Sequence, residues 1–183
     1  YKLLKESNVM NDVRNLIDES VQLLISKCME REIIITTAES CTGGMISQYI
    51  TSVSGSSSVF EYGFVVYSNE AKKKILGVSN ETLLSYGAVS EYTVKEMVKG
   101  ALEYSQADLA VAVSGIAGPK SDDTNKPVGM VCISTSYKNQ DSLTQTFFFD
   151  GDRKAVRLQT VLAAIKLMLE IIEKNKWLTL LKI

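Results

Sequence analysis

The chain has 183 residues, 45% of them hydrophobic, and its 20 basic and 21 acidic side chains leave a formal net charge of −1. This length fits one domain that buries a sizeable core without metals or disulfides. The near balance of charge lacks the basic excess that marks a nucleic-acid or anionic-membrane surface, so we expect no nucleic-acid or membrane partner.

The N-terminal third is expected to alternate helices and strands. Apolar residues recur at helical spacing from Val9 to Glu30, so residues 1–30 are predicted to form an N-terminal helix. A first strand at 32–37 and a helix at 43–53 follow. A glycine-serine turn then leads into a buried second strand at 60–68.

Short helices dominate the middle of the chain. Asn69 can cap a helix that runs through Ile75, and a second helical piece covers 80–86. Ser90 caps the next helix, which covers 91–104. That helix feeds a strand at 109–114, a hydrophobic run of the kind found inside parallel sheets.

The C-terminal third is expected to hold a hairpin and a long helix. Strands at 128–136 and 142–149 are close enough in sequence to pair antiparallel. A cap at residues 150–152 begins the final helix, and an apolar tail covers 175–183. These elements predict a single α/β domain over 1–183, a three-layer α/β/α sandwich with a mixed, mostly parallel sheet.

The cysteines indicate the compartment. Cys28, Cys41 and Cys132 form an odd, widely spaced set, typical of reduced thiols in a cytoplasmic protein. The apolar runs are far shorter than the roughly 20 residues that cross a bilayer. No signal peptide is visible, so the sequence predicts a cytoplasmic protein.

The segment Thr36–Gly44 reads TTAESCTGG, at the junction of the first strand and the next helix. Such a turn exposes Ser40 at the strand end and aims helix-start N–H groups at a ligand. The chain has no histidine, which excludes a Ser-His-Asp triad. Ser40 could equally be a helix N-cap. Cys41 could be a thiolate nucleophile or a small packed thiol.

A base for Ser40 must come from another loop at the same sheet edge. Loops at 40–44, 67–72 and 114–119 all follow strands, and ligands bind at that edge in open α/β sheets. A desolvated Lys72 can be neutral and accept a proton, with Tyr67 as a possible relay. The run Lys72–Lys74 is also typical of a solvated helix face.

Anion and metal sites are less clearly marked. The turn Ser114–Pro119 resembles a backbone cradle for phosphate, but the common triphosphate and dinucleotide fingerprints are absent. Arg153 and Arg157 could grip a phosphate or lie on the surface. Four aspartates suit turns and caps better than a metal site, so no metal or cofactor is expected: Asp122, Asp123, Asp150 and Asp152.

In order and spacing, seven segments together resemble the carboxyl-terminal domain family of the competence/damage-inducible CinA proteins, which also occurs alone as nicotinamide mononucleotide deamidase. One departure is the charged sequence Lys120–Asp123, where the family often has glycines. The matching segments are Thr37–Gly44, Gly55–Ser57, Gly63–Lys72, Gly87–Glu91, Ser114–Pro119, Lys126–Gly129 and Gly151–Arg153.

The resemblance implies an amidohydrolase that converts nicotinamide mononucleotide to nicotinate mononucleotide and ammonia in pyridine-nucleotide recycling. It implies a five-stranded sheet with the fourth strand antiparallel, no cofactor, a small nucleotide substrate and a homo-oligomer. The implied catalytic residues are Ser40, Tyr67 and Lys72. Around them, our own hypothesis places the phosphate either against Gly43 and Gly44 or against the 114–118 turn. The predicted residues binding the oxyanion or phosphate are Cys41, Thr42, Gly43 and Gly44, and those binding substrate are Glu39, Ser114, Gly115, Ile116, Ala117, Gly118 and Arg153.

Two other functions stay open from the sequence. The same glycine turns could bind a nucleotide without catalysis, with Ser40 acting only as a cap. Alternatively, the domain could be an interaction module that uses its apolar tail, Trp177–Ile183, as the contact surface.

Overall fold

The computed structural model describes residues 2–121 and 125–175. Its centre is one five-stranded sheet in the order β2-β1-β3-β4-β5. β1 is parallel to β2 and β3, while β4 is antiparallel to both of its neighbours. The predicted mixed sheet with an antiparallel fourth strand is confirmed. The strands are β1 (Ile35–Glu39), β2 (Phe60–Val65), β3 (Leu109–Gly115), β4 (Met130–Tyr137) and β5 (Leu143–Phe148).

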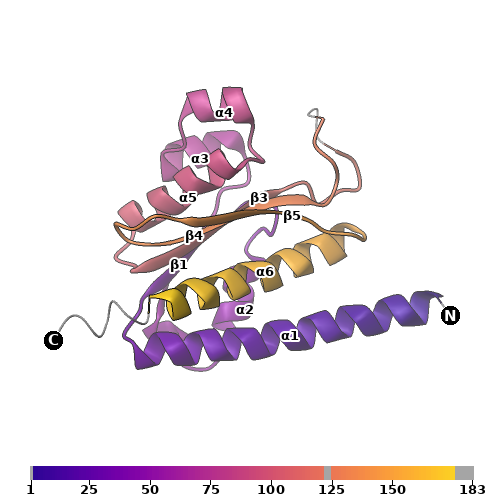
Figure 1. Cartoon of the computed structure of the whole chain (residues 1–183), viewed down its shortest axis with the longest axis horizontal. Coiled ribbons are helices and arrows are strands. Elements are labelled where there is room, and N and C mark those ends of the chain that lie inside the picture. The colour runs from indigo at the N-terminus through magenta and orange to yellow at the C-terminus, as the bar shows by residue number, and fades with distance from the viewer. Residues whose placement is uncertain (1, 122–124, 176–183) are drawn as a thin grey trace.

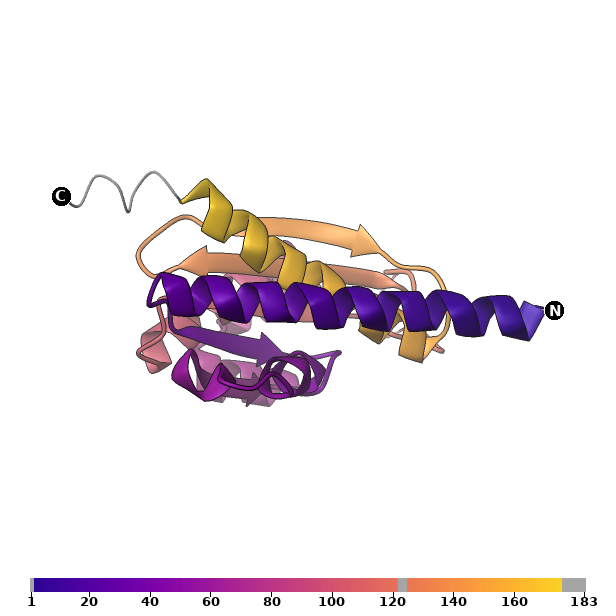
Figure 2. The same ribbon diagram turned by 90° about the horizontal axis from the view of Figure 1, so that it is seen from below.

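Helices cover both faces of the sheet, which confirms the predicted three-layer sandwich (Figures 1 and 2). One face carries α1 (Lys2–Glu30), α2 (Met45–Thr51) and α6 (Arg153–Lys174). The other face carries α3 (Asn69–Leu76), α4 (Asn80–Tyr86) and α5 (Glu91–Tyr104). A short 3-10 helix, η1 (Ser56–Ser58), precedes β2.

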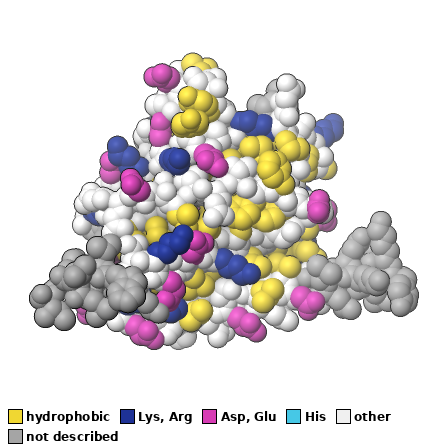
Figure 3. Space-filling view, in the orientation of Figure 1, with side chains coloured by type: hydrophobic (Ala, Val, Ile, Leu, Met, Phe, Trp, Pro, Cys, Tyr) yellow, Lys and Arg dark blue, Asp and Glu magenta, His cyan; other side chains and the backbone are white. Residues whose placement is uncertain are grey.

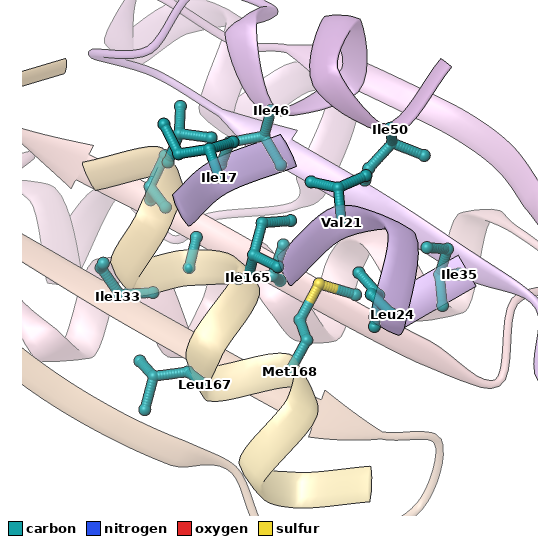
Figure 4. Close-up of a cluster of buried hydrophobic side chains, with 14 of the residues drawn as sticks. Ile17, Val21, Leu24, Ile35, Ile46, Ile50, Ile133, Ile165, Leu167 and Met168 are labelled. Atoms are coloured by element: carbon teal, nitrogen blue, oxygen red, sulfur yellow. The ribbon is translucent and has the colours of Figure 1, made fainter. Parts of the chain in front are cut away.

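Strand β3 shows how the sequence fits two different layers. Leu109, Val111 and Val113 belong to the core under α1 and α6, and Figure 4 shows the large side chains of that core. Ala110 and Ala112 point to the opposite core, under α5. On this side of the sheet, α5 also packs closely against the end of α3, because a Cβ on Gly100 of α5 would lie 1.9 Å from the Leu76 carbonyl oxygen.

Short polar side chains begin four of the helices. Ser90 and Asp152 cap α5 and α6 as predicted, and Ser79 caps α4. The cap of α3 is Ser68, whose hydroxyl accepts from the Ala71 N–H, so the predicted cap at Asn69 is wrong by one residue. The predicted ranges of α4 and α5 are confirmed.

The first two strands differ from the prediction. β1 begins three residues later than expected and includes Glu39, because Glu32 takes a positive φ of 53° after α1 and Ile33 still bonds back to Cys28. β2 ends at Val65 and is not buried: Val65 is 51% exposed. As the first strand of the sheet order, β2 lies at an edge and has a neighbour on one side only.

Charged side chains of both signs intermingle on the face in Figure 3, in keeping with the near-zero net charge. None of the helices in the described part of the chain is long and apolar enough to cross a membrane. The tail Trp177–Ile183, on which the predicted contact between copies rests, lies outside the described residues.

Candidate active site

The three loops singled out in the sequence meet at one cavity of about 290 Å³, at the carboxyl ends of β1, β2 and β3. Its lining includes Ser40 and Cys41 from the first loop, Tyr67 and Lys72 from the second, and the whole segment 114–118 from the third. The volume is near the lower end of the range typical for small-molecule sites.

Ser40 and Lys72 contact each other at the bottom of this cavity. The Lys72 Nζ donates to the Ser40 Oγ at 3.0 Å and to the carbonyl oxygens of Val66 and Tyr67 at 3.1 Å each. Lys72 is only 1% exposed, and no carboxylate of the described residues pairs with it. This burial lowers the pKa of Lys72 to about 8, so a minority of the amine, roughly a fifth, is neutral near physiological pH.

The lysine run in α3 divides into one buried and two outer side chains. Lys73 forms an ion pair with Glu70 at 2.8 Å, and Lys74 is exposed. Successive helix positions point in different directions, so a single lysine of the run faces Ser40. The solvated-face interpretation therefore holds for Lys74 but is wrong for Lys72.

Glu39 organises the turn that presents Ser40. It is fully buried, and its Oε2 accepts from the Thr42 hydroxyl at 2.6 Å and from the Gly44 and Ile46 N–H groups at 3.0 Å each. Its Oε1 accepts from the Ser47 N–H and hydroxyl. Glu39 thus satisfies the start of α2, and it is not among the residues that line the cavity.

The Ser40 side chain does not cap a helix. The residue at the N-cap position of α2 is Gly44, with a φ of 94° and no side-chain cap. Gly43 and Gly44 both take positive φ values that a residue with a side chain rarely adopts. The cap interpretation of Ser40 is therefore wrong, and its hydroxyl is engaged by Lys72 instead.

The backbone N–H groups of the turn fall into two sets. Those of Gly43 and Gly44 are occupied, the first by the Ser40 carbonyl and the second by Glu39. Those of Cys41 and Thr42 have no acceptor on another residue within the described ranges. Only the second pair is left to bind an oxyanion beside the Ser40 hydroxyl.

Tyr67 enters the site differently from the prediction. Its ring is exposed, and its hydroxyl accepts from the Arg153 Nη2 at 2.9 Å. Arg153 also donates to the Gly118 carbonyl at 2.8 Å, so the two side chains bridge two loops at the cavity rim. Among the described residues, the phenol has no bond to Ser40 or Lys72, and Tyr67 reaches Lys72 through its carbonyl only.

Cys41 and Arg157 have structural roles. Burial raises the pKa of the Cys41 thiol to about 12, which keeps it protonated and excludes the thiolate nucleophile. Arg157 donates to the Thr42 carbonyl at 2.6 Å and so braces the turn from α6, rather than lying free on the surface. Thr42 itself is fully buried.

Sequence reasoning missed Ala88 and Val89, which form one wall of the cavity. The rim is completed by Asn69, from the predicted loop 67–72, and by Lys120 and Ser121, from the charged segment that we expected at the edge of a cleft. The only signal for Ala88 and Val89 was their place in a segment that resembles the family. No group of side chains in residues 2–121 and 125–175 is arranged to hold a metal ion, and Asp122 and Asp123 lie outside these ranges.

Comparisons with known proteins identify the family of this chain. The profile of the CinA C-terminal domain matches residues 17–172. The nicotinamide-nucleotide amidohydrolase PncC of Escherichia coli K12 is 50% identical over 132 residues, which cover 72% of this chain and 80% of that protein. A putative competence-damage inducible protein of Caldicellulosiruptor saccharolyticus is 46% identical over 155 residues, but the match spans only 36% of its length.

A solved structure shows the same fold. The competence/damage inducible protein CihA of Agrobacterium tumefaciens superposes with a TM-score of 0.82 at 42% identity, over 86% of this chain and 96% of that one. Profile, relatives and structure lead to one conclusion: this chain belongs to the CinA C-terminal domain family.

Proposed function

We propose that this chain is a serine amidohydrolase that converts nicotinamide mononucleotide to nicotinate mononucleotide and ammonia. The observation that carries the proposal is the 3.0 Å contact between Ser40 and a buried lysine inside a cavity. The substrate is inferred from the relatives at 50% identity, which are named nicotinamide-nucleotide amidohydrolases. The reaction fits a role in pyridine-nucleotide recycling.

The first half-reaction needs a base and then an acid at the same position. Neutral Lys72 accepts the Ser40 proton while the Oγ attacks the carboxamide carbon and the carbonyl electrons move onto oxygen. The tetrahedral intermediate then collapses. The C–N bond breaks, the Lys72 ammonium gives its proton to the departing nitrogen, and ammonia leaves an ester on Ser40.

The second half-reaction repeats these steps with water. Lys72, neutral again, takes a proton from a water molecule that attacks the ester carbon. The C–O bond to Ser40 breaks and the Oγ recovers a proton from Lys72. The product is a carboxylic acid, which loses its proton to solvent and leaves as a carboxylate. Each cycle consumes one water and returns both side chains to their starting state.

The turn after Ser40 supplies the oxyanion donors in this proposal. The backbone N–H groups of Cys41 and Thr42 would hold the negative oxygen in both tetrahedral intermediates, each worth about 3 kcal/mol in comparable hydrolases. Glu39 supports this arrangement indirectly. It binds the N–H groups of Gly44, Ile46 and Ser47, which fixes the turn.

The phosphate of the substrate is assigned to the third loop rather than to the glycine pair. The N–H groups of Gly43 and Gly44 already have acceptors, which makes them poor phosphate donors. The segment 114–118 instead lies beside Lys120 and Arg153 in the same cavity. Arg153 uses two of its five N–H donors in the contacts described above, so three are left for a phosphate.

Replacement of the nucleophile tests the proposal. Ser40→Ala should lower the kcat for ammonia release from nicotinamide mononucleotide by at least about 10⁴-fold, while the Kd for the substrate stays within about threefold. Ammonia release and calorimetric titration measure the two quantities, and Ser52→Ala is a matched control on an exposed serine. Equal turnover in Ser40→Ala and wild type would refute the serine mechanism. Binding without turnover in wild type would favour a non-catalytic nucleotide-binding module.

A further inference from the structure

Lys126 links two segments that the mechanism above does not connect. It lies in the long connection between β3 and β4, within the family-like segment 126–129. Its Nζ donates to the carbonyl oxygens of Tyr86 and Val89, at 2.6 Å each. These two carbonyls flank the turn between α4 and α5, so a single ammonium group holds both ends of that turn.

The carbonyls between these two ends are held as well. The Ala88 carbonyl accepts from the Ser114 hydroxyl at 2.7 Å, and the Gly87 carbonyl accepts from the Thr93 hydroxyl at 2.7 Å. Every carbonyl from residue 86 to residue 89 is therefore bonded to a side chain. Four consecutive carbonyls fixed in this way leave the segment little conformational freedom.

This segment is a wall of the cavity. Ala88 and Val89 line it together with Ser40, and Gly118, Lys120 and Ser121 line it from the other end of the β3–β4 connection. Gly87, with a φ of 78°, lets the backbone pass close to the ammonium: a Cβ there would lie 3.2 Å from the Lys126 Nζ. Lys126 therefore ties the cavity-lining segment 86–89 to the β3–β4 connection, which also lines the cavity.

We propose that Lys126 is a positioning residue that shapes the substrate site by clamping the wall 86–89 to the β3–β4 connection. Lys126 itself does not line the cavity, so it acts through the wall and not on the reacting atoms. Its catalytic consequence rests on the proposed amidohydrolase function. The clamp itself is a property of the folded chain and can be measured without substrate.

The clamp should affect substrate binding more than chemistry. Ser40 and Lys72 are held by other contacts, namely the Ser40 N–H to the Val113 carbonyl and the Lys72 Nζ to two carbonyls after β2. A loosened wall leaves these contacts in place but spreads the substrate contacts over several conformations. The expected signature is a raised KM with a nearly unchanged kcat.

The first experiment compares Lys126→Met, which keeps the apolar stem but loses the donors, with Lys126→Arg, which keeps charge and donors. Lys126→Met should raise the KM for nicotinamide mononucleotide about tenfold with kcat within about twofold, as expected for losing charged hydrogen bonds. Lys126→Arg should recover most of that loss. Lys99→Met, on the exposed side of α5, is the matched control and should match wild type.

A second variant approaches the clamp from the turn. Gly87→Ala puts a methyl against the ammonium at a backbone conformation that favours glycine, and it should raise KM in the same way. An unchanged KM in Lys126→Met, or in Gly87→Ala if Lys126→Met does not fold, would overturn the proposal. So would a fall in kcat at constant KM.

Amide hydrogen exchange of the unliganded full chain separates the clamp from the activity. In Lys126→Met, the amides of residues 87–90 should exchange at least about tenfold faster, while those of β1 and β3 keep their wild-type rates. If wild type releases no ammonia, the proposed function fails but this readout still decides on the clamp. Unchanged exchange at 87–90 would refute the clamp even in an active enzyme.

Discussion

The floor of the cavity, around Ser40, and its wall, residues 86–89, are each held by a lysine, and the two lysines differ in their surroundings. On the floor, Lys72 donates to two backbone carbonyls and to the Ser40 hydroxyl, and it is 1% exposed. In the wall, Lys126 also donates to two carbonyls, but it is only half-buried. In the proposed mechanism the buried lysine beside the Ser40 hydroxyl is the base, whereas we propose a positioning role for Lys126.

The largest difference between the two lysines is expected when Lys72 is replaced. Lys72→Met should lower kcat about 10³-fold, because a positioned general base is worth 10² to 10⁴ in rate. Lys73→Met, the next residue on α3, should stay within about twofold of wild type, since its ammonium pairs with Glu70. Ammonia release under saturating substrate measures both. Similar losses in the two variants would mean that the charge of the helix matters, not a specific base.

The pH dependence should separate the floor from the wall. Because burial lowers the pKa of Lys72 to about 8, the amine is mostly protonated below that pH, and in the proposed mechanism only its neutral form is a base. The kcat/KM should therefore rise about tenfold per unit from about pH 6 and level off above about pH 8. The kcat/KM of Lys126→Met should rise over the same pH range, but it should be lower than that of wild type at every pH. A flat wild-type profile over this range would contradict Lys72 as the base.

The smallest effect is expected at the rim. Tyr67→Phe removes the hydroxyl that accepts from Arg153 but leaves the Tyr67 carbonyl on Lys72. We expect kcat within about threefold of wild type and a KM raised by less than about fivefold, as for a single exposed hydrogen bond. Steady-state kinetics at several pH values measure this. A fall in kcat of about 100-fold or more would restore Tyr67 as a proton relay.

Much of the fold was readable from local pattern. The ranges of α4 and α5, the serine cap at Ser90 and the antiparallel hairpin were predicted correctly, because each depends on residues a few positions apart. The errors arose where residues distant in the sequence, or the place of a strand in the sheet, determined the structure. The exposure of β2 depends on its edge position, and the late start of β1 on the positive φ at Glu32.

The candidate site also has features that the sequence predicted and features that it did not. The sequence pointed to Ser40, Lys72 and the 114–118 turn as neighbours, from the rule that ligands bind at the carboxyl ends of parallel strands. It placed Glu39 among the substrate-binding residues, whereas the Glu39 carboxylate turns inward and binds N–H groups at the start of α2. It also gave Tyr67 a relay role, while the structure directs the phenol to Arg153.

By itself, then, the sequence determined the layers, the caps of α5 and α6 and the candidate nucleophile, since periodicity and turn chemistry are local properties of the chain. Only the tertiary structure decided which lysine meets Ser40, across 32 residues, and that Lys126 holds a wall 37 residues away. The physical reason is that burial and hydrogen bonding depend on the packing of sheet and helices. That packing gives Lys72 and Lys126 different neighbours, and therefore different roles.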